Sequence, residues 1–489
     1  MTRANVTIAI LAVLILVLCT LCYKGRPLFS GQYVPEIGAV VKDISKTSIG
    51  QKIYAQYYEQ LRYFATLEIG PYKGLTKRDN NKIDTFIVTS SFASLVALAG
   101  FFVSAVLFVI NIGQQASISK SKIVITVAMV IIAGTIIRLL LAAVLYGNYD
   151  MNSYEIVTDI LTKGGNVYAQ TDRYNYSPLW FMILFALKRI QLAFDMPFHF
   201  VVRTFLCCVD LLTLCVLLFI ANIRKLPPVR TAIFFYLSPV SFLMTGYHGQ
   251  FENLAMLMVL TGIFMYLWLT TRPVLRAALL WLFATTGMII KHNTFYELII
   301  CLNSSIKRNR IKLPLFLISV AIFLSLFIPY WDMGKKGIIE NVFGYGSLPG
   351  LYGVTSLFRQ PELKYLFIAA MFVFPFFLKG RDIISQCLLG TLFFLSFTTG
   401  ISIQYFILPV AIGVLRPSNF FLLYTLAASV FILGSVNTFF VPGFHLFTWN
   451  GVWVAAVCWF ISEMWFDRKA AACEVAVSKK DKKRQPRRR

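Results

Sequence analysis

Residues 123–150 read IVITVAMVIIAGTIIRLLLAAVLYGNYD, a long apolar run that ends close to an acid. The apolar part, 123–146, exceeds the roughly 20 residues that an α-helix needs to cross a bilayer. Arg138 interrupts this run, and Asp150 follows just beyond its end. Charged side chains are costly at membrane depth, so both are candidates for a structural pair or a functional site. The stretch predicts a transmembrane helix that ends at a polar surface.

The composition extends this prediction to the whole chain of 489 residues. Apolar residues make up 58% and charged residues 14%, whereas a soluble domain has about 45–50% and about 25%. The mean hydropathy is +0.70. The nine cysteines show neither the spacing of a disulfide framework nor that of a metal site. A soluble enzyme and a disordered protein are excluded, and an all-α polytopic membrane protein is predicted, because backbone polar groups in lipid must be satisfied within helices.

Apolar runs recur along the chain. They lie at 6–23, 85–112, 123–146, 201–222, 230–246, 253–270, 276–290, 293–306, 313–330, 364–379, 384–400, 403–416, 420–440 and 449–466. The first run is interpreted as an anchor and not a signal peptide, because no A-x-A-like cleavage site follows it.

Lysine and arginine set the orientation of these runs. With the N-terminus in the cytoplasm, the basic connectors all face inward, and Lys291 is the single cation of the short outer loops. This asymmetry is the one that cytoplasmic loops show. If residues 178–194 crossed the membrane, every later loop would change side, so we expect a re-entrant or interfacial helix there. The long outer segments are then 24–84, 147–200 and 331–363, and function is expected at the outer face.

The chain carries 46 lysines and arginines against 22 acids, a net charge of +24. Part of the excess lies in the tail KKDKKRQPRRR (479–489), which is suited to anionic lipid head groups. Loop bias explains the rest, so no nucleic-acid partner is expected. An ATP-driven pump is excluded because the sequence has no phosphate-binding glycine loop.

Further polar residues fall near the predicted outer ends of the apolar runs. Arg203 and Asp210 are seven residues apart, on one helix face. The run GYHGQFEN (246–253) contains His248, Gln250 and Glu252, and Lys291 and His292 follow a later run. Each has a structural alternative, namely a pair with Asp210 or a carbonyl for Arg138, a solvated acid for Asp150, a helix cap for HGQFE and an interfacial anchor for Lys291. The functional alternative is that these polar residues come together in one site at the outer face.

The segment from Asp150 to Trp180 is the most informative. Tyr154, Val157, Ile160 and Leu161 form an amphipathic stripe that Gly164-Gly165 ends. The sequence YNYSP then predicts a second helix, capped by Ser177 with Pro178 at its first position.

This arrangement resembles the first outer loop of GT-C glycosyltransferases. It is most similar to the first GPI mannosyltransferase, the ER glucosyltransferases of lipid-linked oligosaccharide assembly and bacterial polyprenyl-phosphate-sugar-dependent mannosyltransferases. HGQFEN resembles their H-G-x-F motif, KHNTFY (291–296) their K-x-x-x-x-Y helix end, and Pro-Tyr at 329–330 their Pro-aromatic pair. The resemblance covers about 125–360. The chain departs from the family pattern in having a single acid, Asp150, between Asn148 and Asn152.

The resemblance implies a GT-C helical bundle with interfacial helices in its first outer loop. It divides the chain into an N-terminal part (1–122), a catalytic module (123–360), C-terminal transmembrane helices (361–466) and a basic cytoplasmic tail (467–489). The implied activity is inverting transfer of a hexose, with mannose preferred, from a polyprenyl- or dolichyl-phosphate carrier to a lipid or glycan acceptor. The membrane would be the plasma membrane in a prokaryote, which is favoured, or the ER membrane in a eukaryote.

The resemblance also gives the polar residues their roles. Asp150 would be the general base. Lys291 and His292, with Arg203, would stabilise the leaving phosphate. The remaining expected donor- or acceptor-binding residues are His248, Gln250, Glu252, Tyr154 and Tyr176. No cofactor or metal site is required, although a divalent metal is compatible with the chemistry. The alternatives are a transporter or lipid flippase, which would use paired broken helices, and a structural membrane subunit.

Overall fold

The computed structural model describes residues 120–144, 149–345, 353–354, 362–435 and 451–465. Within these ranges the chain is helical throughout, without a strand, which confirms the all-α prediction. The apolar runs 6–23 and 85–112, the outer segment 24–84 and the tail 467–489 lie outside the described residues.

Among the described residues, four helical segments are long and apolar enough to cross a membrane: Ser121–Ala143, Phe198–Ile223, Pro273–Ile290 and Asn309–Phe343. They correspond to α5 (Lys120–Val144), α9 (Phe198–Ile223), α13 (Pro273–Ile290) and α15 (Asn309–Ser325) with its continuation. The pair α10 (Pro228–Tyr236) and α11 (Pro239–Gly246), bent by 49°, would be a fifth span. These helices indicate a membrane protein.

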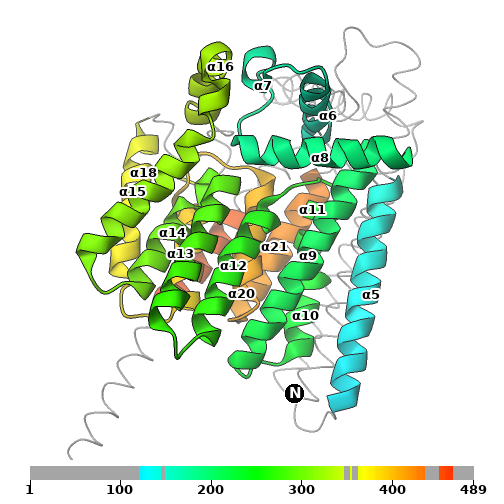
Figure 1. Cartoon of the computed structure of the whole chain (residues 1–489). Coiled ribbons are helices and arrows are strands. Elements are labelled where there is room, and N and C mark those ends of the chain that lie inside the picture. The colour runs from blue at the N-terminus through cyan, green and yellow to red at the C-terminus, as the bar shows by residue number, and fades with distance from the viewer. Residues whose placement is uncertain (1–119, 145–148, 346–352, 355–361, 436–450, 466–489) are drawn as a thin grey trace, which may run out of the picture.

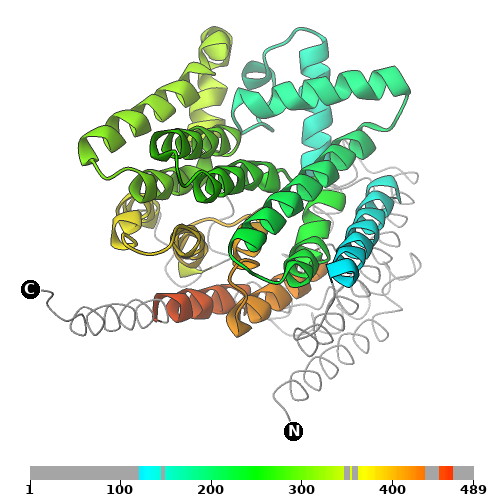
Figure 2. The same cartoon turned by 60° about the horizontal axis from the view of Figure 1, so that its bottom comes forward.

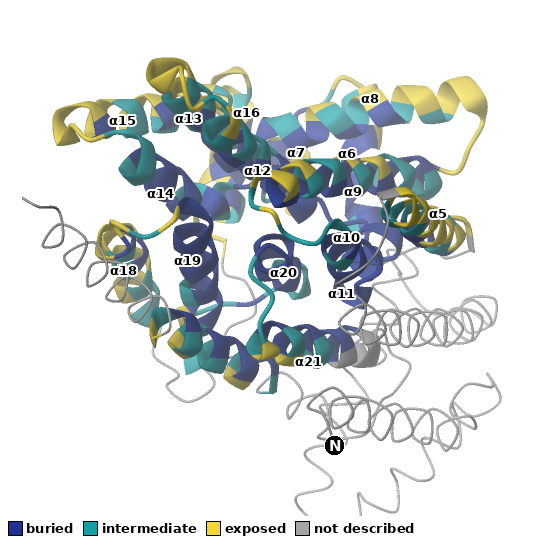
Figure 3. Cartoon of the chain, turned by 90° about the horizontal axis from the view of Figure 1, so that it is seen from below, coloured by how far each residue is buried: buried dark blue, intermediate teal, exposed yellow. Residues whose placement is uncertain are grey.

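Shorter helices fill the rest of the bundle. They are α12 (Glu252–Trp268), η2 (His292–Thr294), α14 (Phe295–Ser305), α18 (Leu363–Phe377), α19 (Ile383–Phe397), η5 (Ile403–Phe406), α20 (Ile407–Gly413), α21 (Asn419–Ser435) and the helix Gly451–Trp465. Figure 3 shows buried residues concentrated in α11, α19 and α20, with exposed residues along α5, α15 and α18. The exposed side chains of α5 include Ile125, Met129 and Ile132. Apolar surface of this extent on long helices is suited to lipid.

A layer of short helices covers one end of the bundle (Figure 1). It consists of α6 (Tyr149–Thr162), α7 (Val167–Gln170), α8 (Pro178–Phe194) and α16 (Trp331–Gly337). Figures 1 and 2 show α8 lying at a steep angle to α5 and α9. The run 178–194 thus does not run alongside the long helices, in agreement with the expectation of an interfacial helix.

The first and third outer segments pack on each other in this layer. After α15, the chain continues through η3 (Ile328–Tyr330), α16 and the π-helix η4 (Ile338–Phe343). Asn166 donates a hydrogen bond of 3.0 Å to the carbonyl of Tyr330. Gly337 approaches Tyr168 so closely that a Cβ there would overlap the Tyr168 carbonyl. These contacts fix residues 331–345 above the segment that begins at α6.

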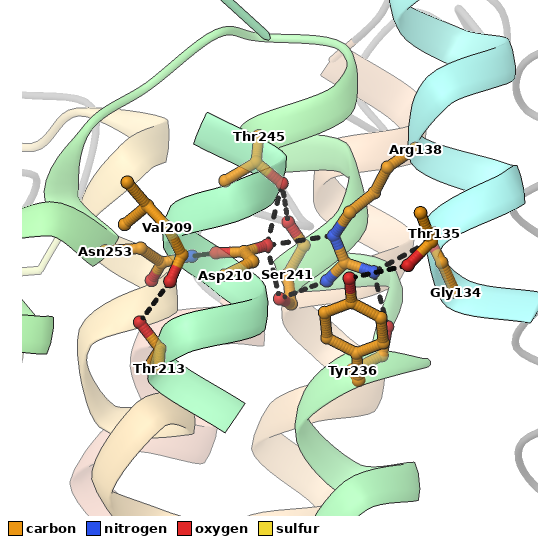
Figure 4. Close-up of polar contacts among 10 residues, drawn as sticks. All are labelled: Gly134, Thr135, Arg138, Val209, Asp210, Thr213, Tyr236, Ser241, Thr245 and Asn253. Atoms are coloured by element: carbon orange, nitrogen blue, oxygen red, sulfur yellow. Dashed lines mark hydrogen bonds and ion pairs between the residues drawn. The ribbon is translucent and has the colours of Figure 1, made fainter. Parts of the chain in front are cut away.

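Arg138 explains how the break between α10 and α11 is stabilised (Figure 4). Its Nη1 donates a hydrogen bond of 2.7 Å to the carbonyl of Tyr236, at the end of α10, and the guanidinium lies 4.0 Å from the centre of that ring. Its Nη2 donates to Ser241 Oγ, 2.8 Å away on α11. One arginine therefore satisfies groups on both sides of the break, which is how broken helices are tolerated within a bundle.

The same guanidinium pairs with Asp210 on α9, with Nε 2.9 Å from Oδ2 and both side chains fully buried. Thr245 and Asn253 also donate to the Asp210 carboxylate. The structural interpretation of Arg138 is thus confirmed, for both the carbonyl and the acid. Arg203, the other cation considered beside Asp210, has a separate set of acceptors.

Candidate functional site

The predicted polar residues of the first and second outer loops meet at the covered end of the bundle. Asp150 lies in the first turn of α6 and accepts a hydrogen bond from Gln250 Nε2. Gln250 belongs to the short turn between α11 and α12. Gly249 turns the chain there with a φ of +66°, and Met151 packs against the space that a Cβ would need. A glycine in the left-handed region thus brings Gln250 to Asp150.

Lys291 and Glu252 form the second polar contact. Glu252 is the first residue of α12, and Lys291 follows the last residue of α13. Lys291 Nζ lies 2.6 Å from Glu252 Oε1, and the two side chains are only 3% and 1% exposed. An interfacial anchor would extend its ammonium group into water. Burial and pairing with Glu252 contradict that alternative.

Two aromatic rings lie against the Lys291 ammonium group. Its Nζ lies 4.2 Å from the ring centre of Tyr176 and 4.3 Å from that of Phe251, within the range of cation–π attraction. Phe251 stacks on Trp180 with centroids 4.0 Å apart. Tyr154 meets Trp180 edge to face at 5.5 Å. Tyr154 and Tyr176 are among the residues predicted from the sequence, whereas Trp180 and Phe251 are not, although Phe251 lies inside the HGQFEN run.

Ser177 attaches the start of α8 to this site. The sequence predicts it as a helix cap, and α8 does begin at Pro178, but the hydroxyl makes no capping bond. It donates instead to the carbonyl of Ile289, 2.6 Å away, in the last turn of α13. This contact fixes Tyr176 beside Lys291.

Asp150 and Glu252 both influence the pKa of Tyr154 and of Tyr176. Burial raises the pKa of Tyr154 well above its usual value, and the carboxylates of Asp150 and Glu252 raise it further. Tyr176 behaves similarly: burial raises its pKa most, followed by Tyr154 and the two acids. The pKa of Tyr345 is raised by burial and then by Asp150. Tyr345 follows η4, so the third outer segment also reaches the site, which the sequence analysis did not predict residue by residue.

Arg203 lies next to the site without facing Lys291. Its side chain is fully buried. It donates to the carbonyl of Ala142 at 2.9 Å, near the end of α5, and to that of His199 at 3.1 Å. A longer contact of 3.3 Å reaches the carbonyl of Gly246 at the end of α11. Arg203 therefore connects the end of α5, which precedes Asp150, with the end of α11, which precedes Gln250. These hydrogen bonds are those expected of a positioning residue.

The two histidines are neutral near pH 7. Burial lowers the pKa of His248 to about 3. Burial, together with the neighbouring Lys291, lowers the pKa of half-buried His292 to about 4. A neutral imidazole can donate a hydrogen bond but carries no charge. Lys291 is thus the cation that the cluster offers to an anionic ligand.

No group of three or more His, Cys, Asp or Glu side chains suited to a metal ion occurs in the part of the chain that the structure describes. Comparison of the chain with protein-family models, with curated proteins and with solved structures finds no match. Chemically, the site combines a partly exposed carboxylate held by an amide with a buried ammonium group. An arrangement of this kind can take a proton from one group and stabilise negative charge on another.

Proposed function

We propose that the chain is a multi-pass membrane glycosyltransferase of the GT-C type. It would move a hexose, with mannose preferred, from a polyprenyl- or dolichyl-phosphate carrier to a lipid or glycan acceptor at the outer or lumenal face. The observation that carries this proposal is the convergence of Asp150, Gln250, Glu252 and Lys291 at one end of the apolar bundle. The resemblance of 125–360 to GT-C loops supports the same reading.

The substrate explains why these groups would be needed together. A lipid-phosphate sugar keeps its tail in the bilayer and its reacting carbon at the level of the head groups. The apolar helices suit the tail, and α8 lies across their ends, where the head group would be (Figure 1). A carboxylate is then needed for the acceptor and a cation for the carrier phosphate.

The proposed reaction is a single displacement. Asp150 accepts the proton of the acceptor hydroxyl while the acceptor oxygen attacks the anomeric carbon. The bond between that carbon and the phosphate oxygen breaks, and its electron pair leaves with the phosphate, whose charge Lys291 stabilises. Attack opposite the leaving group inverts the anomeric configuration. Gln250 would orient Asp150, and Arg203 would position both outer turns.

A transporter or lipid flippase is the second candidate. The 49° break between α10 and α11 favours it, because transporters place broken helices at their binding sites. However, Arg138 already satisfies the Tyr236 carbonyl at this break. We therefore prefer the enzyme. Proteoliposomes that move a fluorescent lipid-phosphate sugar across the membrane without transferring the sugar would favour the flippase.

The decisive test is an assay of the purified full chain. We would incubate it with radiolabelled polyprenyl-phosphate hexoses, one sugar at a time, and a membrane lipid extract as the source of acceptor. We expect label transfer from one donor, with mannose first, and none with Asp150→Asn. The matched control is Asp159→Asn on the same helix, whose acid makes a surface pair with Lys188 at 3.3 Å. Absence of transfer from every donor would contradict the proposal.

A further inference from the structure

We propose that Glu252 is an internal competitor for the phosphate subsite. In the unliganded chain its carboxylate pairs with Lys291, and the carrier phosphate, a diester before sugar transfer and a monoester after it, displaces it from the ammonium group. After the phosphate leaves, the Glu252–Lys291 pair forms again. This inference rests on the proposed function, since it assigns a phosphate to the site, and it adds a mechanism for releasing the spent carrier.

The surroundings of Lys291 leave room for a stronger anion. The ammonium group has three donors. In the described chain, no oxygen other than Glu252 Oε1 pairs with the ammonium group. Its other close contacts are with the rings of Tyr176 and Phe251. The spent carrier ends in a phosphate monoester, which carries about −1.5 to −2 charge and three acceptor oxygens near pH 7, whereas the arriving sugar phosphodiester has a lower charge and two unesterified oxygens. Both can therefore satisfy donors that one carboxylate oxygen leaves unused.

Glu252 partly offsets the cost of being buried without its cation after displacement. It stands in the first turn of α12, where the helix dipole favours a negative charge. Burial raises the pKa of Glu252 most, Lys291 lowers it, and Asp150 raises it as well. A phosphate on Lys291 would compete with a carboxylate that is held by one cation and repelled by one acid.

The competition has opposite effects on binding and on release. Without the Glu252 charge, a phosphate no longer has to break an ion pair, so it binds more tightly. The same change removes the group that reclaims Lys291 when the phosphate departs. Glu252→Gln should therefore bind phosphate monoester more tightly yet turn over more slowly at saturating donor, where release limits the rate.

Equilibrium dialysis with radiolabelled farnesyl phosphate, using the purified full chain in detergent, tests the inference. Farnesol is the control for the lipid tail. We expect Glu252→Gln to bind farnesyl phosphate at least tenfold more tightly than the unchanged chain, and Lys291→Met to bind it at least tenfold more weakly. Asp159→Asn is the matched control, since it breaks a different outer ion pair, and its affinity should stay within twofold. Equal or weaker binding by Glu252→Gln overturns the inference.

Glu252→Asp covers the case in which the glutamine variant does not fold. The shorter side chain keeps the charge but withdraws it from Lys291, so farnesyl phosphate affinity should still rise severalfold. No gain would equally overturn the inference. Sugar transfer is scored separately: transfer without an affinity gain leaves the glycosyltransferase standing and removes the competitor role. An affinity gain without any transfer keeps the competitor role and removes the glycosyltransferase.

Discussion

The hydroxyl of Ser177 donates to the carbonyl of Ile289 at 2.6 Å, which ties the first residue before α8 to the last turn of α13. Tyr174 strengthens this junction by donating to the Ser177 carbonyl at 2.6 Å. Lys291 lies two residues beyond Ile289, and Tyr176 lies one residue before Ser177. A single hydrogen bond thus aligns the aromatic face with the ammonium group it covers.

Ser177→Ala should loosen this junction. The Ile289 carbonyl loses its hydroxyl donor, which costs about 1–3 kcal/mol of unfolding free energy when the group stays buried. Thermal unfolding in detergent would measure the loss, and sugar transfer should fall with it. Ser325→Ala is the control, because that hydroxyl bonds to a carbonyl of its own exposed turn. Equal stability of the two variants would contradict this role of Ser177.

Asp150→Asn should abolish transfer. The amide keeps the size of the side chain but cannot accept the acceptor proton, and loss of a general base costs about 10²–10⁴ in rate. Farnesyl phosphate binding and expression should remain near those of the unchanged chain. Initial rates with the preferred donor check this. Turnover within about threefold of the unchanged chain would move the base to Glu252.

The contributions of Lys291 and Glu252 to the free energy of unfolding should depend strongly on each other. Lys291→Met leaves a buried carboxylate without its cation, a change that typically costs about 3–5 kcal/mol. The double variant Lys291→Met/Glu252→Gln removes both charges and should unfold at a higher temperature than Lys291→Met alone. The exposed pair Lys188–Asp159, with exposures of 17% and 58%, serves as the reference cycle. The coupling free energy between Lys188 and Asp159 should be at most about 1 kcal/mol. A similarly small value for Lys291 and Glu252 would contradict the description of a tightly paired, buried contact.

His248 and His292 should make the protein less stable in acid. Their pKa values are lowered to about 3 and about 4, whereas an unfolded chain has about 6.5. Below pH 6.5 the unfolded state binds more protons, so stability should fall as the pH drops from 6.5 towards 4. Melting temperatures over this range would show the trend. His248→Asn should flatten the slope, and an unchanged slope would mean that His248 does not contribute to it.

The orientation can be tested by cysteine labelling. We expect Lys163→Cys, at the exposed end of α6, to react with a membrane-impermeant reagent from outside. Asn309→Cys, at the basic start of α15, should react only after permeabilisation, because basic connectors face the cytoplasm. The unchanged chain gives the background of its own cysteines. Outside labelling at 309 would reverse the assignment.

Local sequence patterns were sufficient to predict several individual helices. The apolar run before Asp150 is the helix α5, and the stripe from Tyr154 to Leu161 is α6, whose chain turns at Gly164. Loop charge alone indicated that 178–194 does not cross, and α8 lies across the bundle end (Figure 1). These features depend on hydrophobic periodicity and on residues that begin or end helices, and both are encoded over short distances.

The pairing of the charged residues, in contrast, depends on how distant helices pack. Asp210 has Arg203 nearby in sequence, yet it binds Arg138, which is 72 residues away. Arg203 binds the carbonyls at two helix ends instead. Glu252, which could have capped α12, pairs with Lys291, whose ammonium group lies against two aromatic rings. A sequence lists the charged groups, but pairing requires contact within a few ångströms, and that distance is set by how separate helices pack.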